Sequence, residues 1–323
     1  MNALVVGAGS VGQVFAHHLH LGGSEVTFLT RNESTSDIRR NLVLIPLNNP
    51  NARANPVRFS SFDVLTEYSQ LESQSWDQIY VCVPSTGLTS GLLEGIHTYS
   101  GGATIVKIQP GLGDRNTFAK HFEDSQIVSG MVSFISYRAP LSGETVTEPG
   151  MAYWFPPLVK SMFSGPNDRV REVVRALRAG GLPARTHPDV ENLVGYVLAI
   201  EAPLTAGIES VGWSLRRFNR SRWLKVACRG IKEAFEVAAK YQQSYPPIYM
   251  KLVNCLTIRL AIWLLPKGRV FPFESYLEHH FTKVRAQSLQ HLDDYLDQAL
   301  KYDIEVGSLS ELRNAIADGG AVA

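Results

Sequence analysis

The stretch Ala3-Leu4-Val5-Val6-Gly7-Ala8-Gly9-Ser10-Val11-Gly12 decides the fold of this chain. A short apolar run leads into three glycines spaced as GxGxxG, and a helical pattern follows over residues 11–21. A second apolar run occupies residues 26–29. This order of strand, glycine turn, helix and strand is the context in which GxGxxG predicts dinucleotide binding. We therefore expect residues 1 to about 35 to form the first βαβ unit of a Rossmann-type α/β domain.

Each glycine of the turn has a separate expected role. Gly7 permits the tight turn, Gly9 lets the backbone approach a pyrophosphate, and Gly12 lets the helix pack closely on the strand. The helix N-terminus then offers unpaired N–H groups and a partial positive charge to phosphates. The predicted contacts with the cofactor are Gly7, Ala8, Gly9, Ser10, Val11 and Gly12. The alternative is a glycine-rich turn without a ligand.

The end of the second strand distinguishes between the two nicotinamide cofactors. An acidic residue there would bind the ribose 2′-hydroxyl of NAD, whereas an arginine suits the 2′-phosphate of NADP. The sequence reads Thr30-Arg31-Asn32, and Glu33 comes later. We predict NADP(H), with Thr30 and Arg31 beside the ribose. The alternative for Arg31 is a solvated loop residue.

Further strands alternate with helices and so predict a parallel sheet. Apolar runs cover residues 79–83 and 103–108, with a helical pattern between them near residues 88–97. Parallel sheets bind ligands at the carboxyl ends of their strands. The strand ends therefore add Val83, Pro84, Ser85, Gln109 and Pro110 to the predicted cofactor site. Lys107 shares a side of its strand with Gln109. We interpret it as a lysine that extends to solvent from a sheet edge, and the alternative is a lysine that reaches the cleft.

The second half of the chain has a different pattern. Residues 128–163 are rich in short β segments and glycine or proline, which suggests an antiparallel extension of the sheet. A helix near residues 168–179 and a strand at residues 184–186 complete that part. His187-Pro188-Asp189 then begins a long helix, and helical patterning continues to the end. We predict a dinucleotide-binding domain at residues 1–186 and a helical domain at residues 187–323.

Composition narrows the function classes. The net charge of +1 over 323 residues gives no reason to expect a nucleic-acid partner. The N-terminus lacks the features of a secretory signal. Charged and polar residues interrupt the apolar segment 247–266, so we predict a buried or interfacial helix and no membrane span. Cys82, Cys228 and Cys255 suit neither a disulfide framework nor a zinc site, so we expect no metal and a cytoplasmic protein.

A basic stretch with interleaved aromatic residues follows the first long helix. We interpret it as a solvated helix face above a buried aromatic stripe, and an anionic ligand or lipid surface is the alternative. Its basic members are Arg216, Arg217, Arg220, Arg222, Lys225 and Arg229, and its aromatic members are Trp213, Phe218 and Trp223.

Several of these features together resemble the ketopantoate reductase family. The resemblance spans nearly the whole chain and rests on the glycine turn, Arg31, Gln109 before Pro-Gly-Leu-Gly, Gly130 in Val-Ser-Gly-Met, Pro203-Leu204-Thr205-Ala206, Asp294-Tyr295 and residues 302–306. It implies NADPH-dependent reduction of a small 2-keto acid, and a homodimer formed through the helical domain. It also implies a lysine general acid and two asparagines on the first helix of that domain, and a late glutamate and serine that bind substrate.

The sequence departs from the family pattern at those positions. Val194 stands where the lysine would be, and Leu198 and Ala202 stand where the asparagines would be. Leu292 takes the glutamate position, His280 takes the serine position, and Pro110 replaces the asparagine usual after the later strand. A carbonyl reduction needs a proton donor near the developing alkoxide, and these apolar residues cannot supply one. We therefore do not expect ketopantoate to be the substrate.

Other polar residues are available to replace the missing groups. Glu201 lies in an apolar helical segment, where desolvation would raise the pKa of its carboxyl towards that of a general acid. The alternative is a buried carboxylate that a neighbouring arginine or backbone group satisfies. We expect Asn192 and Thr205 near the same helical face. His280 is a second candidate proton donor, and the alternative is a histidine-rich turn at the surface. The predicted function is an NADPH-dependent oxidoreductase for another carbonyl or imine substrate, and the alternative is a catalytically silent NADP(H)-binding sensor or assembly protein.

Overall fold

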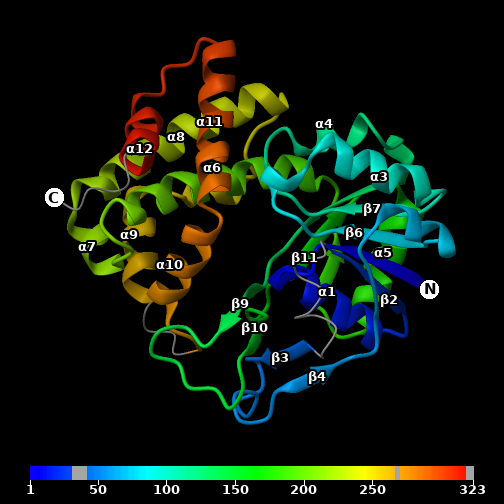
Figure 1. The fold of residues 1–323 in the computed structure, drawn as a ribbon. Helices are drawn as coiled ribbons and strands as arrows, with labels where there is room; N and C mark the ends of the chain where they lie inside the picture. Colours follow the sequence, from blue (N-terminus) through cyan, green and yellow to red (C-terminus); the bar gives the residue numbers. More distant parts are fainter. Residues whose placement is uncertain (31–41, 266–269, 318–323) are drawn as a thin grey trace. The chain divides into compact units, whose positions relative to one another are not determined.

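The computed structural model describes residues 1–30, 42–265 and 270–317, and the chain folds into two compact units. The first unit comprises residues 1–109, 113–140 and 145–191. The second comprises residues 110–112, 141–144 and 192–323. Figure 1 shows the order of the elements along the chain, and each unit is described by itself below.

An eight-stranded sheet forms the centre of the first unit. Its order is β12-β11-β8-β7-β6-β1-β2-β5, and its pairs are parallel except for the antiparallel pair β8–β11. The predicted Rossmann-type α/β class with a helical C-terminal part is confirmed. The strands are β1 (Asn2–Val6), β2 (Glu25–Leu29), β5 (Asp63–Leu65), β6 (Gln78–Val81), β7 (Thr104–Lys107), β8 (Ile127–Met131), β11 (Ser161–Ser164) and β12 (Ala184–Thr186).

Helices cover both faces of this sheet, and the interior strand β1 carries apolar side chains on both. Ala3 and Val5 of β1 pack in a cluster with α1 and α5, whereas Leu4 and Val6 pack in a second cluster with α3 and α4. Such continuous apolar runs are typical of parallel strands buried on both sides. The helices are α1 (Ser10–Leu21), α3 (Ser90–Ser100), α4 (Asp114–Ala119) and α5 (Asn167–Ala179), with 3₁₀ turns η2 (Tyr68–Ser73), η3 (Ser85–Gly87) and η4 (Asp124–Gln126).

The β-rich region after residue 127 is not a single antiparallel extension, because within it only β11 pairs antiparallel in the main sheet, with β8. β8 continues the main sheet in parallel to β7 because residues 127–130 are buried, as a central strand requires. The next two strands, β9 and β10, instead join a separate four-stranded sheet of order β4-β3-β10-β9. It consists of β3 (Leu42–Pro46), β4 (Val57–Phe59), β9 (Ile135–Ala139) and β10 (Gly150–Trp154).

The second unit is helical throughout its described elements. The long helix α6 begins at Val190, where the backbone N–H donates to Ser164 Oγ at 2.9 Å, and from residue 192 onward it belongs to this unit. No helix in the described ranges is both long and apolar enough to cross a membrane. The elements are α6 (Val190–Glu209), α7 (Leu215–Arg220), α8 (Arg222–Gln242), η5 (Ile248–Leu252), α9 (Cys255–Leu264), α10 (Phe273–Lys283), α11 (Arg285–Lys301) and α12 (Gly307–Ala317).

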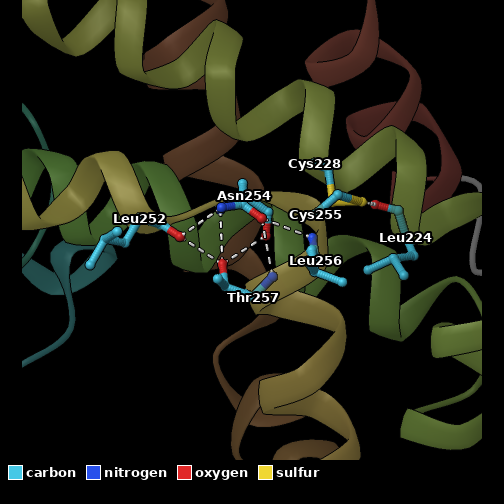
Figure 2. The surroundings of a disulfide bond; sticks show 7 residues. All are labelled: Leu224, Cys228, Leu252, Asn254, Cys255, Leu256 and Thr257. Atoms are coloured by element: carbon cyan, nitrogen blue, oxygen red, sulfur yellow. Dashed lines mark hydrogen bonds between the residues drawn. A yellow bond between two sulfur atoms is a disulfide. The ribbon is translucent and has the colours of Figure 1, made fainter.

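A disulfide joins two helices of the second unit, although the number and spacing of the cysteines did not suit a disulfide framework. Cys228 of α8 and Cys255 at the start of α9 are bonded, and their Cα atoms lie 5.5 Å apart (Figure 2). Cys82 is the free cysteine. The pairing depends on how α9 packs on α8, and cysteines 27 residues apart give no local signal of it. Such bonds persist in oxidising surroundings and open in a reducing cytoplasm.

Reduction of this bond should destabilise the second unit. By closing a loop of this length, the bond lowers the entropy of the unfolded chain and stabilises the fold by about 3.5 kcal/mol in the chain-entropy model. We expect a reductant to lower the thermal unfolding midpoint of the oxidised wild type and to leave the midpoint of Cys228→Ser/Cys255→Ser unaffected. Thiol titration of denatured protein should find one thiol before reduction and three after it. Three thiols in protein kept under air would contradict the pairing.

Candidate functional site

The strand ends of the first unit lie along one edge of the sheet. The register pairs Val6 with both Leu29 and Val81, and Val81 with Lys107, so four parallel strands end at the same level. The residues that follow these strands are Gly7, Thr30, Cys82 and Ile108. The chain passes from β1 to β2 on one side and returns to β6 on the other, which makes this edge a topological switch point.

The glycine turn needs glycine at two positions for steric reasons. Gly7 has a φ of 96°, and a Cβ there would also lie 3.1 Å from Val83 Cγ1. A Cβ on Gly12 would collide with the carbonyl oxygen of Gly7. Gly12 therefore lets α1 approach the end of β1, which is the role expected for the third glycine.

Gly9 differs, because no described atom beyond its neighbours in the chain lies within 4 Å of the position that its Cβ would take. The space over this residue is open, as backbone contact with a pyrophosphate requires. Gly9 is also the N-cap of α1, and no side chain caps that helix or places an acidic group in its first turn. The amides of the first turn therefore remain available to an anion. These features fit the diphosphate of a dinucleotide.

Two polar side chains stabilise the neighbouring strand ends. Gln109 is buried, and its Nε2 donates to the carbonyl oxygens of Val81 and Val83 at 2.8 and 2.7 Å. Ser85 Oγ donates to Asp114 Oδ2 at 2.7 Å. Gln109 and Ser85 thus shape the backbone of the predicted site. Exposed Pro84 lies in the same segment as Val83 and Ser85, whereas Pro110 belongs to the second unit.

Lys107 does not extend to solvent at a sheet edge, as the sequence suggested. β7 is a central strand, and the Lys107 side chain is 1% exposed with its Nζ 2.7 Å from Glu191 Oε1. Glu191 lies in the first turn of α6. The ion pair therefore attaches the start of α6 to the carboxyl end of β7. Sequence reasoning missed this pair because the strand order was not predictable from a single strand.

The two partners of this ion pair should differ in their effect on stability. Glu191→Ala leaves an ammonium group buried without its partner, and we expect a loss of about 3 kcal/mol in the free energy of unfolding. Lys107→Met leaves a carboxylate that is 29% exposed and can be hydrated, so the loss should be about 1 kcal/mol. Urea unfolding of both variants measures the difference. Equal losses would contradict the asymmetry.

Arg31, the predicted 2′-phosphate contact, lies outside the described residues. Thr30 is the last described residue before it, and the Thr30 backbone N–H donates to the Leu65 carbonyl oxygen at 3.0 Å. The Thr30 amide is therefore used within the sheet.

Two tyrosines of the second unit, Tyr276 and Tyr295, lie close enough to Glu201 to feel its charge. Glu201 is exposed on α6, yet surrounding protein desolvates its carboxyl and raises the pKa. Burial, and then the charge of Glu201, raise the pKa of the Tyr276 phenol of α10. The same charge contributes to the raised pKa of Tyr295 on α11 after burial and Asp294. Among the described residues, the Glu201 carboxyl has no hydrogen-bond partner or ion pair.

Asn192 does not share a helical face with Glu201. Both lie in α6, and nine residues correspond to two and a half turns, which places them on opposite sides. Asn192 Oδ1 instead accepts a hydrogen bond from Ser244 Oγ at 2.5 Å. Thr205, one turn after Glu201, is 7% exposed. The expectation that the three residues meet was therefore wrong for Asn192.

His280 lies beside the same tyrosine but is a weak proton donor. Its ring stacks on Tyr276 with centroids 5.4 Å apart and contacts Phe281 edge-on at 4.9 Å. Burial, with the nearby charges of Lys283 and His279, lowers the pKa of His280 to about 4. The imidazole is thus neutral near pH 7. Tyr276, which sequence reasoning missed, was detectable because it lies one helical turn before His280.

The residues predicted to stand at the family's catalytic positions are buried. Val194, Leu198 and Ala202 of α6 are buried at 4%, 1% and 6% exposure, and Leu292 of α11 is fully buried. These side chains contribute to the apolar interior. The described residues include no group of three or more histidine, cysteine or acidic side chains placed to hold a metal ion.

Comparison with known proteins agrees with this architecture. Residues 3–153 match the family model described as "Ketopantoate reductase PanE/ApbA", which confirms the resemblance predicted from the sequence. No curated protein matches the chain significantly in sequence.

Solved structures of similar fold extend over both units. A PanE/ApbA family ketopantoate reductase from Ralstonia eutropha JMP134 is 17% identical, with a TM-score of 0.73 over 98% of this chain and 97% of that one. D-mandelate dehydrogenase with NADH and anilino(oxo)acetate is 14% identical, with a TM-score of 0.75 over 99% and 98%. 2-Dehydropantoate 2-reductase from Geobacter metallireducens GS-15 is 15% identical, with a TM-score of 0.71 over 98% and 99%. At these identities the likeness shows the fold.

Proposed function

We propose that this protein is an NADPH-dependent oxidoreductase that reduces a small carbonyl or imine substrate other than ketopantoate. The observation that carries the proposal is the glycine turn, whose Gly7 and Gly12 are sterically required and whose Gly9 leaves open space at a helix N-terminus. The family match over residues 3–153 covers this turn and supports the reaction class. Similar folds are named for mandelate dehydrogenation and 2-dehydropantoate reduction, which favours a small hydroxy or oxo acid.

The reduction needs a hydride from the cofactor and a proton from the protein. Bound NADPH supplies a hydride to the electrophilic carbon, and the chain must supply a proton to the oxygen or nitrogen. Glu201 is the group best suited to that task, because its raised pKa favours the protonated carboxyl and it is exposed. Tyr276 lies near it as a neutral phenol and can orient a substrate by hydrogen bonding.

Glu201→Gln tests this assignment. A glutamine keeps the shape but cannot donate the proton, so we expect kcat to fall by on the order of 10²–10⁴-fold while NADPH affinity stays unchanged. In the wild type, reduction should slow as the pH rises through the raised pKa of Glu201, because the carboxyl then loses its proton. That dependence should disappear in the variant. The measurement is a pH profile of kcat, followed by nicotinamide absorbance.

Glu209→Gln is the matched control for this experiment. Glu209 lies on the same helix, and its Oε1 is 2.8 Å from Arg285 Nε, so its carboxylate has a structural partner. We expect this variant to lose stability and to keep both kcat and the pH profile. If Glu201→Gln behaves like Glu209→Gln, the proton comes from another group although the enzyme assignment stands.

Arg31→Ala tests the choice of cofactor. The sequence places this arginine directly after Thr30 at the end of the second strand, where a 2′-phosphate is bound in NADP-dependent proteins of this fold. Loss of a charge-assisted hydrogen bond should weaken NADPH binding at least about tenfold and leave NADH binding unchanged. Fluorescence titration with both cofactors measures this, with Arg175→Ala on α5 as an arginine control. Equal affinities of the wild type for NADPH and NADH would contradict the preference.

The buried Val194, Leu198 and Ala202 support a second candidate function. A protein that binds NADP(H) without turnover, as a sensor or assembly partner, needs no general acid on α6. Screening 2-keto acids, ketones and imines with NADPH distinguishes the two functions. Tight NADPH binding with no oxidation by any substrate class would favour the silent protein.

A further inference from the structure

The second unit exposes an apolar surface that the proposed chemistry does not use. Of the fifteen large apolar side chains that are exposed in the described part of the chain, nine lie between residues 245 and 265. We call them the α9 surface. Its members are Tyr245, Ile248, Tyr249, Leu252, Leu256, Leu260, Trp263, Leu264 and Leu265.

α9 itself is apolar on two opposite faces. Ile258 and Ile262 are buried at 7% and 5% exposure, in a cluster shared with α7 and α8. Leu256, Leu260 and Trp263 follow the other face at helical spacing and are 76%, 53% and 56% exposed. A helix that is hydrophobic all round normally has a second apolar environment. The exposed face of α9 therefore requires an occupant.

Basic residues are concentrated in the sequence segments that contain α7 and α9. Residues 210–232 hold seven lysines and arginines, residues 243–273 hold four, and neither segment contains an acidic residue. α7 contacts α9 and buries Leu215 and Phe218 in the same cluster. Arg216, Arg217 and Arg220 of α7 are exposed, as is Arg259 of α9.

We propose that the α9 surface binds the surface of an anionic lipid bilayer, with α9 lying in the interface. Leucine and tryptophan would enter the boundary between headgroups and acyl chains, and the arginines would attract lipid phosphates. A nucleic acid offers the phosphates but no environment for the apolar face. A second copy offers the apolar face, but a two-fold contact would bring like charges together.

The start of α9 is held firmly enough to serve as such a platform. Asn254 Oδ1 accepts hydrogen bonds from the N–H groups of Leu256 and Thr257 at 3.0 and 3.1 Å, and Thr257 Oγ1 donates to the Leu252 carbonyl at 2.7 Å. Cys255 is bonded to Cys228 of α8 (Figure 2). Insertion would therefore need no folding of the helix, which lowers the entropic cost of binding.

Vesicle sedimentation with the full oxidised chain tests the proposal. We expect binding to vesicles of phosphatidylserine and phosphatidylcholine in equal amounts, and much weaker binding to phosphatidylcholine alone. Binding should weaken as salt rises, since salt screens the arginines. Equal binding to both vesicle types, or no binding to either, would overturn the proposal.

Two variants separate the apolar from the electrostatic contribution. Leu260→Glu should reduce vesicle affinity at least about tenfold, because it removes an inserted leucine. Arg216→Gln/Arg220→Gln should reduce it about fivefold for each charge removed. The matched control is Leu300→Glu, which makes the same change at a leucine of α11 that is 85% exposed. A control that loses as much affinity as Leu260→Glu would also overturn the proposal.

Folding and self-association are measured on the same proteins. Leu260 is exposed, so Leu260→Glu should retain the thermal midpoint and the NADPH affinity of the wild type. Light scattering without lipid should give the same mass for both. A wild type with the mass of an oligomer, together with a Leu260→Glu variant with the mass of a smaller species, would show that a second copy covers the α9 surface. That result would contradict lipid binding.

Discussion

The close contact between Gly12 of α1 and the carbonyl of Gly7 is the constraint on which the first unit depends. Any side chain at Gly12 would occupy the position of that oxygen. With hydrogen there, α1 begins directly at the end of β1, and its first-turn amides lie at the same edge where β2, β6 and β7 end. Steric packing and anion binding thus arise from one contact, because the helix that packs closest also presents its N-terminus.

Local sequence patterns predicted helices and strands, whereas their positions in the sheets depend on contacts between residues far apart in the sequence. The run from Ala3 to Gly12 specified β1, its turn and α1 because each depends on neighbours in sequence. The second sheet was not predictable, since β3 pairs with β10 about a hundred residues later in the chain. Lys107 was misjudged for the same reason: only the strand order shows that β7 is central and that its lysine needs Glu191.

The surroundings of the candidate proton donor Glu201 were only partly predictable from the sequence. Sequence identified Glu201 from its apolar neighbours, and the structure gives the direction of its pKa shift that this setting implies. The other polar partners came from elements distant in sequence. Tyr276 and Tyr295 reach the charge of Glu201 from α10 and α11, while Asn192 pairs with Ser244. Helical periodicity alone already excludes Asn192, because two and a half turns separate it from Glu201.

The net charge of the chain does not show that basic residues are concentrated in the segments that contain α7 and α9. The chain carries 31 basic and 30 acidic residues, and eleven of the basic ones lie in the two acid-free segments around α7 and α9. The remainder is therefore acidic, with 20 basic against 30 acidic residues. A hydropathy pattern cannot tell a buried helix from an interfacial one, since both need apolar residues. Exposed leucines on α9 and exposed arginines on α7 favour the interfacial alternative, because water solvates the arginines but leaves the leucines without an apolar environment.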